Sequence, residues 1–250
     1  RLIEAMRIAN PEVELTLVGD DWQAINRFAG SDLSIMRAAS KPKFDRKVVP
    51  LGETHRFPQS LANFSSKFIQ ENPAQLRKEI SSQSPVSSSE TLFLHWNTEL
   101  GENLENLQQV IKFIGSGNTS HSELMVIARY SNNLPTLSQV EKFWKGPVSL
   151  KTIHSSKGME ADYVIVMDVQ QDNRGFPSTI EDDPVIKLVL PDSETYEHAE
   201  ERRIFYVALT RARVACHLIT PVQAPSLFAL ELSENQIGKD IGLDLTLNVL

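Results

Sequence analysis

The sequence is poor in cysteine and in long apolar runs. Cys216 is the only cysteine among 250 residues, so no disulfide forms within the chain and no zinc site can be built on sulfur. No apolar run reaches the 18 residues of a membrane-spanning helix, and no charged-then-apolar leader opens the chain. We therefore expect a cytoplasmic protein, with no membrane partner and with Cys216 as a buried, inert thiol.

A basic excess is also absent. The formal net charge is −7, so a contact with nucleic acid would have to be a local groove and not a broad surface. A small basic cluster at Lys41, Lys43, Arg46 and Lys47 includes Asp45 and is typical of a solvated linker. Residues 40–50 also contain two prolines, and we place a domain boundary near position 47.

Strand-like and helix-like patterns alternate along the chain. Strands are predicted at Val13–Val18, Thr91–Trp96, Leu124–Ala128, Val148–His154, Tyr163–Val169 and Val214–Thr220. Helices are predicted at Leu2–Ala9, Leu61–Gln70, Glu99–Ile114, Leu134–Trp144 and Asp192–Arg211, and the serine-rich residues 80–90 predict a mobile loop. Because several strands, such as VIVM at 164–167, are continuously apolar, we expect an α/β fold with a mostly parallel sheet and helices on both faces.

Ligands of such sheets bind beyond the carboxyl ends of the strands, so the polar segments that follow strands are candidates. In Gly19–Gly30 (GDDWQAINRFAG), Gln23 can both donate and accept and could report a phosphate. Trp22 and Phe28 offer flat faces on which bases could stack, and the alternative is that they are ordinary core aromatics. Arg56, within THRF, could grip a phosphate bidentately or form a surface ion pair.

Two further segments carry candidate chemistry. Thr152–Glu160 (TIHSSKGME) offers small hydroxyl residues and a glycine for close approach to a phosphate backbone, and Glu160 could accept from a ribose hydroxyl. Lys157 could bind phosphate or be a solvent-exposed lysine. In Glu200–Arg213 (EERRIFYVALTRAR), Arg211 could be favoured by the helix dipole or could act as an arginine finger.

In this order, the segments GDDWQAI, THRF, TIHSSKGME and EERRIFYVALTRAR resemble motifs III to VI of superfamily 1 helicases of the UvrD/Rep type. The resemblance runs from about residue 12 to about residue 215. It implies two RecA-like motor domains that face each other across one ATP. Residues 1–47 would be the C-terminal remnant of the first domain. Residues 48–250 would be the second domain, with the family's accessory insert absent or minimal.

The resemblance also implies residue roles. At the nucleotide, the γ-phosphate would be contacted by Gln23, Arg56 and Arg211, the ribose by Glu160 and the adenine by His55. Along the DNA, the contacts would come from Asn26, Phe28, Thr152 and His154. Family members usually have tyrosine where this chain has Asn26 and His55, so stacking on both the DNA and the adenine is expected to be weaker here.

The sequence contains neither a G-x-x-x-x-G-K-[ST] loop nor a D-E-x-x motif. We therefore expect the ATP phosphates and the Mg²⁺ ligands to be held by an N-terminal motor domain of the same protein, and the isolated chain to be inactive. The resemblance implies that the other partner is single-stranded and partly duplex DNA, along which the protein would move in the 3′ to 5′ direction. Two alternatives are a non-catalytic binding or regulatory module and the motor part of a helicase–nuclease. No nuclease-like carboxylate cluster shows in the last thirty residues.

Overall fold

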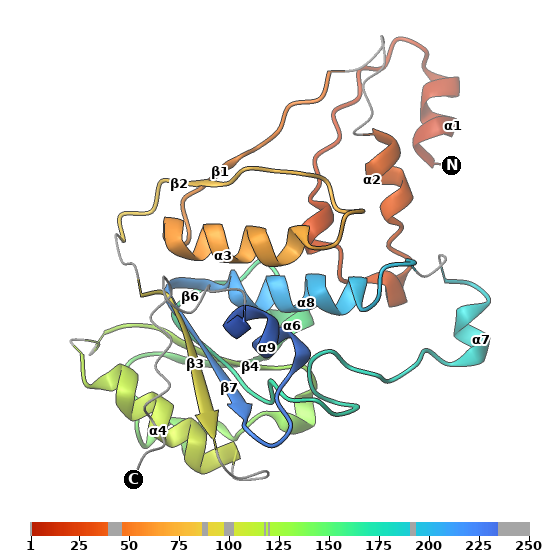
Figure 1. Ribbon diagram of the computed structural model, residues 1–250. Coiled ribbons are helices and arrows are strands. Elements are labelled where there is room, and N and C mark those ends of the chain that lie inside the picture. The colour runs from red at the N-terminus through yellow and green to blue at the C-terminus, as the bar shows by residue number, and fades with distance from the viewer. Residues whose placement is uncertain are drawn as a thin grey trace.

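The computed structural model describes residues 2–39, 47–86, 90–97, 103–117, 119, 121–190 and 194–234 (Figure 1). Its α-helices are α1 Leu2–Ala9, α2 Leu33–Ala39, α3 Gln59–Gln70, α4 Asn103–Gly115, α5 Leu137–Glu141, α6 Ile153–Ser156, α7 Pro184–Lys187, α8 Ala199–Leu209 and α9 Leu227–Glu234. Short 3₁₀ turns are η1 Asp21–Gln23, η2 Arg27–Ala29 and η3 Ser131–Asn133. The strands are β1 Glu53–Thr54, β2 Ser81–Ser82, β3 Leu92–Asn97, β4 Leu124–Ala128, β5 Val148–Thr152, β6 Ala161–Val166 and β7 Ala212–Pro221.

One parallel sheet organises the molecule. Its strand order is β3-β7-β6-β4-β5, and every neighbouring pair runs in the same direction. Leu92 of β3 lies opposite Cys216 of β7, and Leu124 of β4 lies opposite Val148 of β5. Parallel neighbours need crossover connections, which carry the helices onto the faces of the sheet. The predicted α/β class with a mostly parallel sheet is confirmed.

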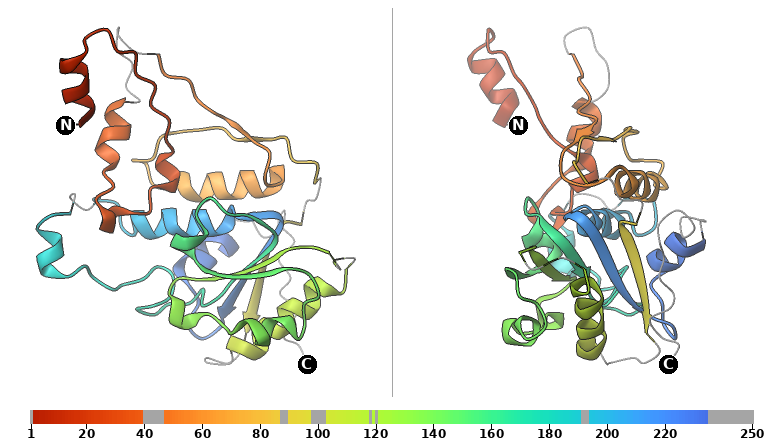
Figure 2. Two further views of the ribbon diagram at one scale, coloured as in Figure 1. Left: turned by 180° about the vertical axis from the view of Figure 1, so that it is seen from behind. Right: turned by 90° about the vertical axis from the view of Figure 1, so that its left-hand side faces the viewer.

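Two apolar cores lie on the two faces of the sheet. Successive strand residues point to opposite faces, so Val164 and Val166 of β6 join one core and Ile165 joins the other. The first core packs under α3, α8 and α9, and the second packs under α4 and α5. Figures 1 and 2 show α3 and α8 side by side, with α4 on the opposite face of the sheet. The prediction of helices on both faces is confirmed.

Several predicted elements are found with small changes of boundary. α1 and β4 have the predicted bounds, and α3, β3 and β7 differ from the prediction by a few residues at most. α5 begins only at Leu137 because Thr136 caps it, with the Gln139 side chain accepting from the backbone N–H of Thr136 at 2.7 Å. The helix predicted from Glu99 is described from Asn103 as α4.

The strand predicted at Val13–Val18 is wrong. Within the described chain this segment pairs with no strand, and Leu15, Leu17 and Val18 are 46%, 52% and 80% exposed. The alternation of apolar residues marks one side of an extended segment, but a strand also needs a neighbour for its backbone hydrogen bonds. The apolar stretch Val48–Leu51 is likewise irregular and exposed, and the strand that precedes Arg56 is β1.

Two predicted elements have a wrong boundary. The helix predicted from Asp192 begins as α8 at Ala199, because His198 has a left-handed φ of 55° that no helix residue adopts. The strand predicted to end at His154 ends at Thr152, whose side chain caps α6 by accepting from the N–H of Ser155 at 3.3 Å. His154 therefore lies on a helical turn and not at a strand end.

The serine-rich segment is partly ordered, contrary to the predicted mobile loop. β2 pairs in parallel with β1, and the Ser82 hydroxyl donates to the carbonyl of Phe57 at 2.6 Å. Residues 87–89 lie outside the described residues, as does most of the basic cluster at 40–46; Lys47 is exposed. The boundary near position 47 stays a prediction. However, residues on its N-terminal side pack into the main core, since Trp22 and Ile25 belong to the first core.

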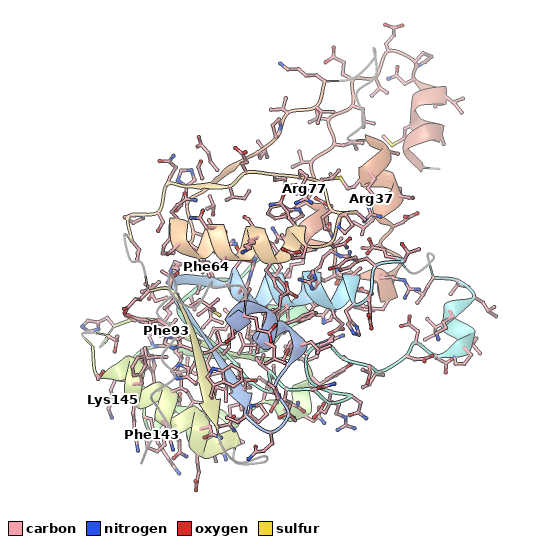
Figure 3. The ribbon with its side chains drawn as sticks, viewed as in Figure 1. Arg37, Phe64, Arg77, Phe93, Phe143 and Lys145 are labelled. Carbon is pink, nitrogen blue, oxygen red and sulfur yellow. The ribbon has the colours of Figure 1, made fainter. Side chains whose placement is uncertain are left out.

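The sheet buries titratable groups at its centre. Cys216 of β7 is fully buried, as predicted, and burial raises the pKa of its thiol far above the ordinary range, which favours the inert character expected of it. Nearby, His95 Nε2 lies 2.9 Å from His217 Nδ1. The ring of Phe93, which is labelled in Figure 3, stacks on that of His217. Burial, together with the adjacent His95, holds the pKa of His217 well below its usual range.

Asp168 is a buried carboxyl just beyond β6. It is 4% exposed, adopts a left-handed φ of 53°, and accepts a hydrogen bond from the side chain of Asn133. Burial, and to a smaller extent the negative charge of the nearby Asp172, raise its pKa to about 6. The native state therefore binds more protons at Asp168 than the unfolded state between about pH 4 and pH 6.

Replacement of Asp168 by asparagine is predicted to stabilise the protein at neutral pH. The amide side chain would keep an acceptor, tolerate the left-handed backbone and carry no charge to bury. The gain in the free energy of unfolding over wild type should grow from pH 4 to pH 6 and then level off at about 2–3 kcal/mol. Urea unfolding of both proteins across pH 4–8 measures it. A difference that does not change with pH would contradict the assignment.

Candidate nucleotide and DNA site

The GDDWQ segment forms a tight turn that holds Gln23. Asp20 caps η1 by accepting from the N–H of Trp22 at 3.1 Å, and its second oxygen accepts from Gln23 Nε2 at 2.6 Å. Lys78 pairs at 2.6 Å with Asp20 and also with Asp21, whose side chain is fully buried. The side-chain amide of Gln23 is therefore oriented by the carboxylate of Asp20, which is itself paired with Lys78.

The two aromatics of this segment have different roles. Trp22 is 1% exposed, meets Tyr206 of α8 edge-on at 5.4 Å between ring centroids, and donates its indole N–H to the carbonyl of Leu76 at 2.9 Å. It is a core residue, so the hypothesis that a base stacks on it is wrong. Phe28 is 60% exposed and meets the ring of His154 edge-on at 5.4 Å. Phe28 is thus exposed and not part of the core, as a stacking surface for a base must be.

Arg211 is buried at the C-terminal end of α8. Its Nε donates to the carbonyl of Val207 at 2.9 Å, Nη1 to the carbonyl of Met159 at 3.2 Å, and Nη2 to the Thr210 hydroxyl at 3.2 Å. The contact with Val207 is the one expected from the helix dipole. Burial, and then the positive charge of Arg56, lower the pKa of Arg211 to about 10.

Arg56 reaches the same end of α8. Its Nε donates to Glu160 at 2.7 Å, and Nη1 makes a long hydrogen bond of 3.5 Å to the carbonyl of Thr210. Glu160 also pairs with Arg213 at 3.3 Å. The hydrogen bond from Arg56 holds the pKa of Glu160 below its usual range. Thr210 is thus shared by Arg56 and Arg211, and the two guanidinium groups converge on one place.

The remaining predicted nucleotide residue lies at the edge of this group. His55 is exposed and follows Thr54 of β1, whose hydroxyl accepts from the N–H of Arg56 at 3.4 Å. The contact of His55 with adenine stays a prediction. Lys157 is exposed, and its Nζ donates to the carbonyl of Gln23 at 2.8 Å, which joins the TIHSSKGME segment to the GDDWQ turn. Gly158 beside it has a left-handed φ of 85°, which favours glycine there.

The four residues predicted to face DNA lie together. His154 Nε2 donates to the carbonyl of Ile25 at 3.0 Å, which holds the ring beside Phe28 and near Asn26. Burial, and then the positive charge of Arg129, lower the pKa of His154, which favours the neutral form of the ring. Thr152 caps the helical turn that bears His154. The arrangement offers an aromatic face with small hydroxyl groups beside it, which suits a nucleic-acid strand.

Sequence reasoning missed two charged residues of this region. Arg129 follows β4 directly and pairs with Glu201 of α8 at 2.7 Å. The rule that polar residues after strands line the site would have found it. Lys78, the partner of Asp20, lies in an irregular segment after α3 and carries no comparable pattern.

The described residues contain no helix that is long and apolar enough to cross a membrane. In the same part of the chain, no group of three or more histidine, cysteine, aspartate or glutamate side chains could hold a metal ion.

Comparison with known proteins assigns the domain. Residues 59–222 match the family model of the UvrD-like helicase C-terminal domain, and they include α3, the parallel sheet and α8. The chain belongs to the UvrD-like helicase family. DNA helicase IV of Escherichia coli (strain K12) is 34% identical over 236 residues, which cover 94% of this chain and 33% of that protein. The pairing of GDDWQAI with THRF predicted a resemblance to DNA helicase IV, and this match confirms it.

This UvrD-like chain thus spans about a third of the length of that relative. Among solved structures, the C-terminal domain of a possible DNA helicase from Lactobacillus plantarum WCFS1 is similar with a TM-score of 0.42 at 12% identity. The match covers 70% of this chain and 91% of that one. So distant a likeness has no bearing on the chemistry of the site.

Substitutions of the two aromatics of this UvrD-like domain are predicted to have opposite effects. Trp22→Ala should lower the free energy of unfolding by about 3–5 kcal/mol, because it leaves a cavity against α8. Phe28→Ala should cost about 1 kcal/mol or less, because its ring is mostly exposed. Thermal and urea unfolding of the chain measure both. Equal losses in the two variants would mean that Phe28 is structural and not an open platform.

Proposed function

We propose that this chain is the C-terminal motor half of an ATP-dependent 3′–5′ DNA helicase, which presents arginines to an ATP gripped by an N-terminal motor domain. The observation that carries the proposal is the convergence of Arg56 and Arg211 on Thr210, next to the turn that holds Gln23. Two cations at the end of one helix are suited to a polyanion such as a triphosphate.

The electrostatics of Arg211 support this role. Among the described residues, its donors reach carbonyl and hydroxyl oxygens, whereas Arg202 and Arg213 pair directly with carboxylates. Its positive charge is therefore not cancelled by a bonded anion. A pKa of about 10 keeps it protonated at neutral pH. A guanidinium that is removed from water and not cancelled by an anion stabilises negative charge more strongly than a solvated one.

The other residues would act around the same ATP, which supplies the energy of phosphoryl transfer. Gln23, fixed by Asp20, would sense the γ-phosphate, Glu160 would accept from the ribose hydroxyl, and His55 would cover the adenine. Arg56 and Arg211 would meet the transferring group only when the two motor domains close. The described residues include no metal-binding cluster, and we assign the Mg²⁺ ligands to the N-terminal domain.

The DNA side of the proposal rests on the exposed ring of Phe28 and its neighbour His154. A single strand would stack on Phe28 and run past Asn26, Thr152 and His154. Base stacking of this kind is worth roughly 1–3 kcal/mol per base and does not depend on sequence. Closure and reopening of the ATP cleft would move this grip relative to that of the other domain.

Loss of Arg56 or Arg211 is predicted to abolish ATP turnover by the full-length protein. Arg211→Lys keeps a charge but loses the planar fork, and removal of such a finger lowers turnover by roughly 10³–10⁵-fold. Arg56→Gln should also lower the kcat strongly. Steady-state ATPase assays at saturating single-stranded DNA measure both effects.

The control for Arg56→Gln is Arg213→Gln, because both residues pair with Glu160 but Arg213 is held by Glu123 and Asp162 as well. Its kcat should stay within about threefold of wild type, well short of a finger's contribution. The isolated chain should not hydrolyse ATP. ATP turnover by the isolated chain that Arg211→Ala leaves unchanged would overturn the proposal.

Restoration of a stacking face at position 26 is predicted to tighten DNA binding. Asn26→Tyr in the full-length protein should lower the Kd for a labelled oligothymidine by roughly 5–150-fold, the value of one additional stacked base. Fluorescence anisotropy titration measures the Kd. Phe28→Ala, which removes a stacking ring, serves as the control and should raise the Kd. An unchanged Kd would remove Asn26 from the DNA path.

A further inference from the structure

The first turn of α8 binds four different parts of the protein. Glu200 accepts from the N–H of Arg27 at 3.2 Å, and Glu201 pairs with Arg129 beyond β4. Arg202 pairs with Glu231 of α9, and Arg203 donates to the carbonyl of Ala24 at 2.7 Å and to Glu194. Glu194 also binds Arg37 of α2, which is labelled in Figure 3. This turn is therefore the point where the DNA-facing segment meets the motor core.

The pair between Glu201 and Arg129 is bidentate and nearly buried. Arg129 Nη2 donates to Glu201 at 2.7 Å and Nε lies 3.2 Å from both oxygens, while the two side chains are 14% and 13% exposed. Glu201 also accepts from the N–H of Ser178 at 3.1 Å. Breaking such a pair leaves an uncompensated buried charge, so the two groups move together.

Arg129 adjoins the residues that we propose to hold DNA. It follows β4, and β4 pairs with β5, which leads into Thr152 and His154. Its positive charge reaches His154, whose pKa it lowers after the effect of burial. Its guanidinium lies 4.8 Å from the centroid of the Tyr130 ring. The negative charge of a DNA strand bound across Phe28 and His154 would therefore act on Arg129 at short range.

The other end of α8 carries Arg211. The helix has 11 residues, so at about 1.5 Å per residue it spans roughly 16 Å. Its side chains from Arg202 to Leu209 are all buried, which makes it a rigid body within the core. A displacement of its first turn is thus transmitted to Thr210 and Arg211.

We propose that Glu201 is a positioning residue that couples occupancy of the DNA track to the placement of Arg211. The inference rests on the proposed function, because it needs DNA at one end of α8 and ATP at the other. Glu201 itself touches neither. It fixes the first turn of α8 to the end of β4, so that a change at Arg129 moves the helix and with it the guanidinium at the nucleotide.

The same helical turn provides a matched control. Arg202 and Glu231 also form a bidentate pair, with two contacts of 2.7 Å and exposures of 8% and 22%. Arg202 additionally donates to the carbonyl of Phe68 at 2.9 Å, so this pair joins α8 to α3 and α9 and not to the DNA-facing strands. Glu231→Gln therefore weakens the anchoring of α8 without touching the proposed coupling.

The test measures coupling as an equilibrium quantity in the full-length protein. The Kd for a labelled oligothymidine is determined by anisotropy with and without a non-hydrolysable ATP analogue. The ratio of the two Kd values is the coupling factor, which is roughly 5–150-fold in coupled systems. In Glu201→Gln the ratio should fall towards one, and in Glu231→Gln it should equal that of wild type. Arg129→Lys, which keeps the charge but loses the fork, should behave as Glu201→Gln does.

The outcomes separate the two proposals. Equal ratios in wild type, Glu201→Gln and Glu231→Gln, with wild type clearly different from one, would overturn the coupling role and leave the helicase proposal standing. An equal fall in both variants would also overturn it, because the effect would then be loss of packing. A wild-type protein that binds neither the oligonucleotide nor the analogue would overturn the proposed function and the coupling with it.

Discussion

The burial of Trp22 against Tyr206 of α8 is the contact on which the rest of the site depends. It fixes a turn from the N-terminal part of the chain onto a helix from the C-terminal part, although the two lie far apart in the sequence. With this turn in place, Gln23 is bound by Lys157, two residues before the Met159 carbonyl that accepts from Arg211, and Phe28 lies against His154. Both halves of the proposed motor surface therefore share one hydrophobic anchor.

The charges around this anchor are placed at an energetic cost. The lowered pKa of Arg211 means that the fold disfavours its protonated form relative to water. A well-packed apolar residue would be more stabilising at such a place, which is why buried ionic groups are poor stability devices. Burial likewise raises the pKa of Glu200, so the fold also disfavours the charged form of this carboxyl group. Local departures from good packing chemistry of this kind are concentrated at functional sites.

The sequence predicted the parts of the fold that depend on local pattern. Burial on both faces leaves a continuous apolar run, which predicted the strand Leu124–Ala128. Burial on one face leaves apolar residues at helical spacing, which predicted the helix after Pro58. Val13–Val18 has the alternation of a strand yet forms none, because pairing depends on a partner elsewhere in the chain. Motif order located the candidate site residues. It could not show that Trp22 is core and Phe28 exposed, since both are aromatics of the same short segment and only tertiary packing distinguishes them.

Cys216 has a practical consequence. It lies in β7, which β3 and β6 flank on both sides, and burial keeps its thiol protonated far above neutral pH. Thiol reagents attack the thiolate, so they cannot modify the native protein at this position until the centre of the sheet opens. The rate of modification of Cys216 therefore reports how often the centre of the sheet opens. Conversely, a cysteine introduced on the surface can carry a fluorophore by itself, without removal of the natural thiol.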